Sequence, residues 1–228
     1  MARFSRLNVY STMIQTGAVP LFYHDNVEEA VCAIQALVEA GVRCVEFTNR
    51  GDRAHIVFEQ LACRFRNEPG LILGAGTIMD PGTASLYMQL GADFIVSPIF
   101  DEETARVCNR RKVAYIPGTA TASEIARAQE MGAEICKIFP GQQLGGPGFI
   151  KAVMGPMPWA RLMPTGGVSP TRENVQGWIE AGAAGVGLGS NLISKQVFID
   201  GAYSSLKETA GQVLEWIRES RSRINFKL

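Results

Sequence analysis

The sequence predicts a parallel α/β fold, and favours an eight-stranded (β/α)8 TIM barrel that forms one domain over residues 1–228. Two patterns predict this fold. A unit in which a helical run ends at a glycine and a β-rich stretch follows recurs four times, at Gly41, Gly91, Gly132 and Gly182. Such repetition is typical of a closed or a doubly wound parallel sheet. Eight strand-like stretches separated by helical patterns favour the closed form.

The expected strands are short apolar stretches rich in β-branched and aromatic residues. They are Val19–Tyr23, Cys44–Thr48, Leu71–Ala75, Phe94–Ser97, Ala114–Pro117, Ile135–Phe139, Arg161–Pro164 and Gly185–Leu188. Helix starts support this register, because Asp80-Pro81 and Ser169-Pro170 each combine an N-cap residue with proline at the first helical position. Thr121 and Glu124 have the spacing of a capping box. The segments before Ala18 and after Asp200 predict extra N-terminal and C-terminal helices.

Composition excludes several classes of protein. The formal net charge is zero and the isoelectric point is about 6.7, which lacks the basic surplus of a nucleic-acid reader. Five cysteines, an odd number without CxxC spacing, are typical of reduced thiols rather than a disulfide scaffold. No signal peptide and no membrane-length apolar run are recognised, so a cytoplasmic protein without a membrane partner is expected.

Two predicted strands each carry an ionisable residue between apolar neighbours, Glu46 between Val45 and Phe47, and Lys137 between Cys136 and Ile138. Burying either charge alone is unfavourable by several kcal/mol, so something must compensate. Strand alternation places Glu46, Thr48 and Arg50 on one face of their strand, and Ile135, Lys137 and Phe139 on one face of theirs. If these faces line the barrel, an amine, a carboxylate and a guanidinium converge near its carboxyl-end mouth.

A buried Glu46–Lys137 ion pair that only stabilises the barrel is one interpretation. Catalysis is the other, and the position of Lys137 favours it. Lys137 lies just before Phe139-Pro140, where its strand ends, and barrel chemistry occurs at the carboxyl ends of strands. Burial favours a neutral amine, which is the form that attacks a keto group.

Glycine turns follow three of the strands. Thr165-Gly166-Gly167 and Gly187-Leu188-Gly189-Ser190 allow backbone N–H groups to approach an anion, as in the usual barrel phosphate site, although turns need glycine for purely structural reasons too. Gly74-Ala75-Gly76-Thr77 adds a hydroxyl at the same end. The two histidines, His24 and His55, cannot supply a histidine-rich zinc site, so no metal is expected. Alternation directs Cys136 towards the outer helices.

Six motifs occur in one order: Val45-Glu46-Phe47-Thr48-Asn49-Arg50, Gly74-Ala75-Gly76-Thr77, Ser97-Pro98, Ile116-Pro117-Gly118, Lys137-Ile138-Phe139-Pro140 and Pro164-Thr165-Gly166-Gly167-Val168. Jointly they resemble the 2-keto-3-deoxy-6-phosphogluconate (KDPG) aldolase and 4-hydroxy-2-oxoglutarate (KHG) aldolase family, over about residues 8–215. The resemblance implies a class I, Schiff-base-forming aldolase that cleaves KDPG, or a related 2-keto-3-deoxy sugar acid, to pyruvate and an aldehyde such as glyceraldehyde 3-phosphate.

The resemblance also implies roles for individual residues. Lys137 forms the imine and Glu46 moves protons. The implied substrate-binding residues are Arg50 and Thr77 for the carboxylate, Pro98 and Phe139 as pocket walls, and Gly166, Gly167 and Ser190 for a distal phosphate, with Thr165 and Gly189 beside them. The family further implies a homotrimer that uses no metal and no organic cofactor.

This sequence departs from the family pattern at three places. His24-Asp25 stands where a basic residue is common, Gly141-Gln142 replaces Ala-Glu after Pro140, and Asn49 and Gly51 flank Arg50. These changes leave the imine chemistry intact and bear on the distal end of the substrate. Two other functions remain open from the residues alone. One is a non-catalytic sugar-phosphate-binding barrel, and the other is a barrel isomerase or synthase that uses the phosphate loops without an imine.

Overall fold

The computed structural model describes residues 2–224, so residues 1 and 225–228 of the predicted domain lie outside the described part. The strands are β1 (Ala18–Phe22), β2 (Cys44–Thr48), β3 (Ile72–Gly76), β4 (Phe94–Val96), β5 (Ala114–Ile116), β6 (Gly118–Thr119), β7 (Cys136–Ile138), β8 (Leu162–Pro164) and β9 (Val186–Leu188). The eight predicted strands are confirmed to within one residue at each end. The strand predicted at Ala114–Pro117 differs, because Pro117 has no N–H to donate and separates β5 from β6.

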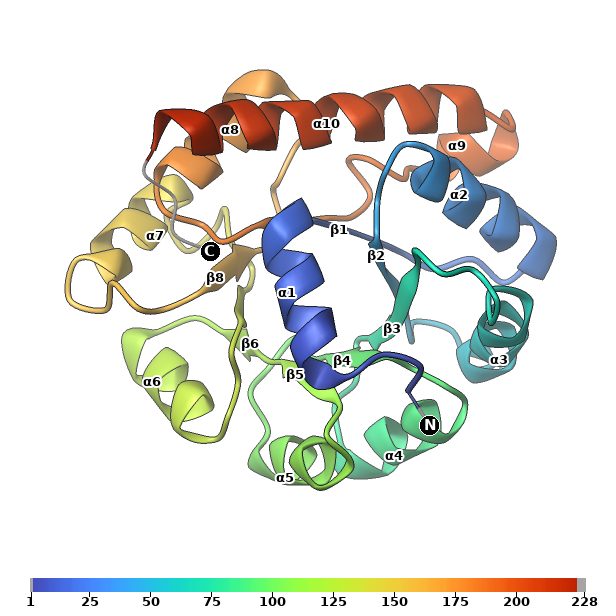
Figure 1. The fold of residues 1–228 in the computed structure, drawn as a ribbon, viewed down its shortest axis with the longest axis horizontal. Coiled ribbons are helices and arrows are strands. Elements are labelled where there is room, and N and C mark those ends of the chain that lie inside the picture. Colours follow the sequence, from blue (N-terminus) through green and yellow to red (C-terminus); the bar gives the residue numbers. More distant parts are fainter. Residues whose placement is uncertain (1, 225–228) are drawn as a thin grey trace.

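All the strand pairs are parallel. A six-stranded sheet has the order β5-β4-β3-β2-β1-β9, and a three-stranded sheet has the order β6-β7-β8. Just past the end of β8, Thr165 forms an isolated parallel bridge with Gly187 of β9. The result is a curled parallel sheet with helices around it (Figure 1).

Apart from α1, the helices that connect or flank the strands surround the curled sheet on its outside (Figure 1). The helices are α1 (Arg6–Thr16), α2 (Val27–Glu39), α3 (Ala54–Arg64), α4 (Pro81–Gln89), α5 (Glu102–Arg111), α6 (Ala122–Glu130), α7 (Pro147–Met154), α8 (Arg172–Glu180), α9 (Lys195–Ile199) and α10 (Tyr203–Arg223). The predicted terminal helices are therefore confirmed as α1 and α10. Helix α9 was not predicted.

The predicted helix ends are mostly correct. Gly41, Gly91, Gly132 and Gly182 all have left-handed φ values, as a glycine just past a helix requires. Asp80 and Thr121 are N-caps, and Thr121 forms the full capping box. The prediction of Ser169 as an N-cap is wrong. Helix α8 begins two residues later than predicted, after Thr171, because the Asn174 side chain accepts a hydrogen bond from the Ser169 amide (2.9 Å) and holds that residue in a preceding turn.

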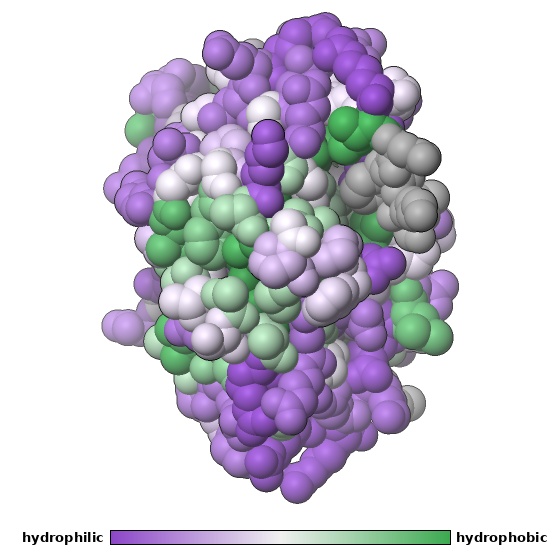
Figure 2. Space-filling view, turned by 90° about the vertical axis from the view of Figure 1, so that its left-hand side faces the viewer, coloured by the Kyte–Doolittle hydropathy of each residue, from purple (hydrophilic) through white to green (hydrophobic). Residues whose placement is uncertain are grey.

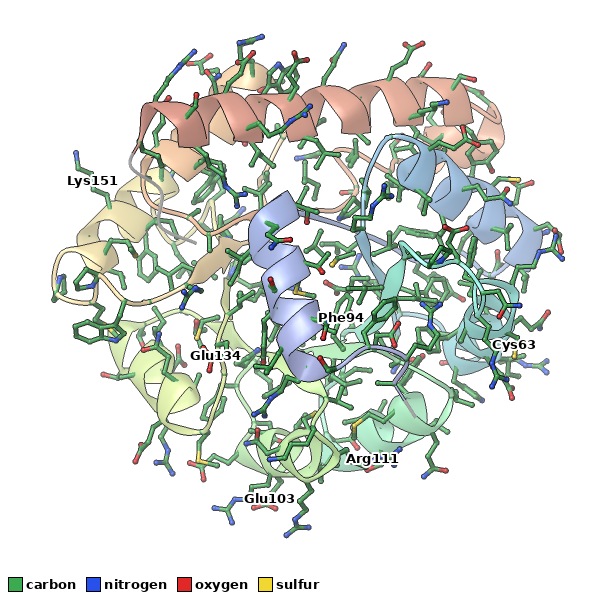
Figure 3. The ribbon with its side chains drawn as sticks, in the orientation of Figure 1. Cys63, Phe94, Glu103, Arg111, Glu134 and Lys151 are labelled. Atoms are coloured by element: carbon green, nitrogen blue, oxygen red, sulfur yellow. The ribbon has the colours of Figure 1, made fainter. Side chains whose placement is uncertain are left out.

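The side of the molecule on which α7 lies, at the left of Figure 1, faces the viewer in Figure 2. An apolar area lies near the centre of this face. Trp159, in the loop after α7, is 65% exposed, and Phe149 and Met157 are only partly buried. Lys151 points away from α7 at the rim (Figure 3).

Helix α1 lies across the amino ends of the strands (Figure 1). Its residues Val9, Tyr10 and Met13 pack in one cluster with strand side chains that point inward, including Phe94, which lies beside α1 in Figure 3. The Tyr10 hydroxyl donates to the Tyr115 carbonyl (3.0 Å) and accepts from the Tyr115 amide (3.1 Å). This end of the sheet interior is therefore apolar and its buried hydroxyl is satisfied.

Arg3 fastens the segment before α1 to the same end. Its guanidinium donates to the carbonyls of Phe65 and Leu71, both at 2.6 Å, and to Asp93 Oδ2 at 3.1 Å. Asp93 is buried, and it also accepts from the amides of Arg3 (2.7 Å) and Leu73 (3.2 Å). The buried carboxylate is thus fully paired.

The last long helix closes the outside of the fold. Helix α10 packs against α8 and α2. Arg221, near its end, donates to the carbonyls of Gln15 (2.7 Å) and Ala184 (2.6 Å). Burial lowers the pKa of Arg221 to about 10, because desolvation disfavours its charged form.

Candidate active site

Lys137 and Glu46 meet inside the curled sheet. Each lies at the centre of its strand, β7 and β2 respectively, and its side chain points inward. Their side chains are 6% and 2% exposed, and Lys137 Nζ lies 3.8 Å from Glu46 Oε1. The two strands belong to different sheets, so the contact is made across the interior. The expected convergence of the amine and the carboxylate is present in the structure, whereas Arg50 lies past the end of β2 and is exposed.

Lys137 and Glu46 lie close together but do not form a hydrogen bond with each other. A separation of 3.8 Å is longer than a hydrogen bond, and Glu46 Oε1 has no hydrogen-bond partner among the described residues. Lys137 Nζ also lies 5.3 Å from the centre of the Phe139 ring. Two hydroxyl oxygens, Thr48 Oγ1 and Thr165 Oγ1, are buried and likewise lack a partner within residues 2–224. Unpaired buried groups are unfavourable, so this cluster is suited to receive a polar ligand.

Two glycines allow this cluster to pack closely. A Cβ atom added to Gly76 would lie 1.7 Å from Glu46 Oε1, and one added to Gly187 would lie 2.2 Å from Thr165 Oγ1. Both distances are far below van der Waals contact. Gly76 therefore fixes where the Glu46 carboxylate can lie, which the sequence indicated only as a turn.

Thr77 follows β3 and has a φ of 59°, in the left-handed region. A β-branched residue rarely adopts this conformation, and such strain is typically retained at functional sites. Thr77 is half-buried at the carboxyl end of the sheet. Its position agrees with a role at this mouth, although it does not line either cavity described below.

Arg50 lies past the carboxyl end of β2. Its backbone amide donates to the Thr48 carbonyl (2.9 Å), whereas its exposed guanidinium forms no hydrogen bond or ion pair with another described residue. Its neighbour Asn49 is held from two sides, because its amide donates to the Gly76 carbonyl (2.8 Å) and its side chain accepts from the Tyr87 hydroxyl (2.9 Å). Arg50 is thus a free cation next to a fixed backbone.

A pocket of about 110 Å³ lies among the glycine turns, and we call it the glycine-loop pocket. Seven of the nine predicted substrate-binding residues line it: Arg50, Phe139, Thr165, Gly166, Gly167, Gly189 and Ser190. Thr77 and Pro98 do not. The backbone N–H groups of Gly166, Gly167 and Ser190 donate no hydrogen bond to the described backbone, so they are available to an anion.

Gln142 does not line this pocket, but it packs closely against Gly167, which does. A Cβ atom added to Gly167 would lie 2.2 Å from Gln142 Cβ, and the Gln142 amide donates to the Gly166 carbonyl (3.0 Å). The residue that departs from the family pattern, Gln142, therefore contacts the Gly166-Gly167 turn. The Pro98 carbonyl oxygen lies close to Gly118 at the start of β6, because a Cβ atom added to Gly118 would lie 2.1 Å from that oxygen.

A second cavity, of about 580 Å³, adjoins the first, and we call it the aromatic cavity. It lies between α9 and the residues that follow β1, including the unusual His24-Asp25. Sequence reasoning missed its wall residues Tyr23 and Phe198, because the five-residue helix α9 was not predicted. The sequence feature that could have predicted α9 is Ser194, a favoured N-cap residue type, directly before Lys195.

Residues 2–224 contain no group of three or more His, Cys, Asp or Glu side chains placed to hold a metal ion. Within the same residues, no helix is both long and apolar enough to cross a membrane. All five cysteines are free thiols. Cys136 belongs to the apolar cluster that also contains the helix residues Ile125 and Ile150, so it faces the outer helices as predicted.

The fold and site together define a class of protein, a parallel α/β enzyme with a buried amine and carboxylate that meet inside its curled sheet. A family model described as KDPG and KHG aldolase matches residues 9–208. This chain therefore belongs to the KDPG and KHG aldolase family, as the sequence motifs predicted. The prediction of a carbon–carbon lyase of this family is confirmed.

Individual relatives agree with this assignment. The 2-dehydro-3-deoxy-phosphogluconate aldolase of Treponema pallidum is 33% identical over 162 residues, which cover 71% of this chain and 76% of that protein. The KHG/KDPG aldolase of Escherichia coli is 30% identical over 90% of this chain and 94% of its own length. Among solved structures, KDPG aldolase from Legionella pneumophila, with pyruvate captured at low pH as a covalent carbinolamine intermediate, is 27% identical with a TM-score of 0.81, covering 89% of this chain and 96% of that one.

Proposed function

We propose that this protein is a class I aldolase that cleaves 2-keto-3-deoxy-6-phosphogluconate, or a related 2-keto-3-deoxy sugar acid, to pyruvate and an aldehyde. The observation that carries the proposal is the buried Lys137–Glu46 pair at 3.8 Å, with the carboxylate unpaired on one oxygen. Family membership supports it, as does the carbinolamine of pyruvate in the Legionella relative.

Lys137 supplies the nucleophile. Its neutral amine attacks the C2 keto carbon, and the resulting carbinolamine loses water as Glu46 donates a proton. The protonated imine then draws the electrons of the C3–C4 bond, while the Glu46 carboxylate accepts the proton of the C4 hydroxyl. The aldehyde leaves with C4. Protonation of the enamine at C3 and hydrolysis of the imine release pyruvate and restore the amine.

The surrounding residues position the substrate. In this proposal the free guanidinium of Arg50 and the Thr77 hydroxyl bind the keto-acid carboxylate, and Pro98 and Phe139 form walls for the pyruvyl group. Gly166, Gly167 and Ser190 bind a distal phosphate through their unused N–H groups, with Thr165 and Gly189 completing that pocket. Within residues 2–224 these N–H groups donate no hydrogen bond to another backbone group, which supports the assignment of the phosphate to this pocket.

The fold and the assembly extend the proposal. We infer that the two sheets close into one (β/α)8 barrel domain, because only Pro117 separates β5 from β6 and the Thr165–Gly187 bridge joins the other ends. The family resemblance implies a homotrimer, and the apolar face around Trp159 offers a surface for it. Five free thiols agree with a cytoplasmic location. No observation favours a binding-only or an isomerase barrel.

The test is incubation with pyruvate and borohydride, followed by peptide mass mapping. Reduction makes the imine irreversible, so we expect a modification at Lys137 alone. Lys151, an exposed lysine on α7, serves as the internal control for nonspecific labelling. Modification elsewhere, or none, would contradict the mechanism.

The phosphate is tested separately with Ser190→Asp. A carboxylate in the glycine-loop pocket should repel a phosphorylated substrate and weaken it far more than an unphosphorylated one. Ser194→Asp, at the N-cap of α9 outside that pocket, is the control. Equal losses for both substrates in Ser190→Asp would argue against a phosphate at this position.

A further inference from the structure

The two cavities at the carboxyl-end mouth are continuous. Leu21, Arg50 and Ser190 line both of them. The glycine-loop pocket also contains Phe139, whose ring neighbours the Lys137 amine. Lys137 itself lines neither cavity, but a ligand that extended from its amine past the Phe139 ring would meet the glycine turns first and the aromatic cavity beyond them.

The difference in size indicates what each space can hold. The glycine-loop pocket, at about 110 Å³, is suited to a small anion. The aromatic cavity, at about 580 Å³, lies in the range of roughly 300–1,000 Å³ that is common for pockets of sizeable organic ligands. A three-carbon aldehyde that ends at the glycine turns would leave the larger cavity unused.

The walls of the aromatic cavity are suited to a flat apolar group. The rings of His24 and Phe198 lie 4.3 Å apart at 33°, and Phe22 packs against Phe198 at 5.9 Å. Ile199 lies at the rim and is 75% exposed, which is unusual for a large apolar side chain beside a cavity. A ring placed here would contact aromatic faces and cover Ile199.

The charges of this cavity lie at particular places. Arg50 and Lys195 line it, and neither is paired with another described residue. The carboxylate of Asp25 is 85% exposed, 3.7 Å from His24. The free cations suit the carboxylate or phosphate of a substrate, whereas the wall between them suits its uncharged part.

We propose that this enzyme also cleaves substrates whose aldehyde half carries a ring-sized apolar group that occupies the aromatic cavity. This inference rests on the proposed aldolase function and adds to the sugar acids a second substrate class, 4-hydroxy-2-keto acids with an aryl or similarly bulky tail. The reaction is unchanged: the C3–C4 bond breaks, the C4 hydroxyl loses its proton, and pyruvate and the bulky aldehyde are released.

The experiment compares two substrates that differ only by the ring. 4-Hydroxy-2-oxohexanoate gives pyruvate and propanal, and 4-hydroxy-2-oxo-6-phenylhexanoate gives pyruvate and 3-phenylpropanal. Burial of a phenyl group predicts a kcat/KM about 10- to 100-fold higher for the phenyl substrate. Equal values, or a slower phenyl substrate, would overturn the proposal.

Variants then locate the effect. Phe198→Ser removes the stacking ring, and Ile199→Ser changes an exposed side chain that the fold does not need. Both should reduce the preference for the phenyl substrate while leaving cleavage of 4-hydroxy-2-oxohexanoate within about twofold. Leu7→Ser, which replaces another exposed apolar residue on α1, is the matched control and should keep the full preference. A preference that survives in both cavity variants would place the ring elsewhere and overturn the proposal.

A separate measurement distinguishes this inference from the proposed function. Exchange of the pyruvate methyl protons with deuterated water requires the Lys137 imine and no aldehyde. Exchange without a phenyl preference would overturn the substrate class and leave the aldolase in place. Absence of both exchange and borohydride labelling would overturn the aldolase and this inference together.

Discussion

The two ends of the strands differ in how their buried polar groups are treated. At the amino end, α1 covers an apolar interior, and the buried carboxylate of Asp93 accepts from Arg3 and from two amides. At the carboxyl end, Glu46, Thr48 and Thr165 each leave a buried oxygen without a partner among the described residues. One end is saturated and the other is open.

This difference follows from parallel strands. Because every strand runs in the same direction, all their carboxyl ends gather at one mouth, and groups there can be kept for a ligand while the opposite end supplies stability. Substitutions at the two ends should therefore change different quantities. Activity should respond at the carboxyl end, and the free energy of unfolding at the amino end.

The largest effect is expected at Lys137. Lys137→Ala should reduce kcat to near background, since no imine can form, while the circular dichroism spectrum stays that of the parent. Glu46→Gln should slow turnover by about 10²–10⁴-fold, the usual contribution of a general acid–base group. Pyruvate release measures both. Near-parental turnover in either variant would remove that residue from the mechanism.

Gly76→Ala should have the next largest effect. The new Cβ would come within 1.7 Å of Glu46 Oε1, so the carboxylate must move. We expect a loss of about 10²-fold or more in kcat, comparable to losing the acid–base group itself. Gly211→Ala in α10 is the control, because nothing lies within 4 Å of its added Cβ and alanine favours a helix. Equal activity of the two variants would show that the Glu46 position is not critical.

At the amino end of the strands, a substitution should lower the free energy of unfolding rather than the activity. Arg3→Ala leaves the buried Asp93 charge without its cation, and breaking such a pair destabilises proteins by about 3 kcal/mol. Denaturant unfolding measures this, and kcat of the folded protein should remain parental. Lys207→Ala breaks an exposed pair with Glu39 instead and should lower stability by less than about 1 kcal/mol. A fall in kcat for Arg3→Ala would break the division between the two ends.

The smallest effect is expected from thiol alkylation. Burial raises the pKa of Cys136 and of Cys108 to about 12, so both stay protonated at pH 8, whereas Cys32 and Cys63 are exposed. Iodoacetamide at pH 8 should modify only Cys32 and Cys63 in the native protein and leave activity unchanged. Mass mapping checks the sites. Rapid modification of Cys136, next to Lys137, would mean that β7 is accessible from outside.

Sequence reasoning succeeded where a local pattern decides the structure. Alternation along β2 and β7 sufficed to bring Glu46 and Lys137 together, because a strand has only two faces. Glycine caps and the Thr121 capping box were likewise local. The Ser169 cap was wrong because Asn174 competes for its amide, a contact that residue types alone do not rank.

The missed features depend on distant contacts. The close approach of Gly76 to Glu46 needs the register of β2 against β3, which pairs Glu46 with Gly74 and Thr48 with Gly76. The aromatic cavity needs α9 to lie against residues that follow β1, about 170 positions earlier in the chain, and such long-range contacts have no local pattern. The strand break at Pro117 was foreseeable, since proline cannot donate to a ladder.

The pairing of β1 with β9 also bears on how the chain is made. Ala18 pairs with Val186, so β1, which is synthesised first, cannot complete its pairing until β9 has been synthesised. Until then β1 has an unsatisfied edge, and unpaired edges are templates for association with other chains. Contacts of such long sequence separation slow folding. Newly synthesised molecules should therefore pass through an aggregation-prone interval that shortens only once the C-terminal part has emerged.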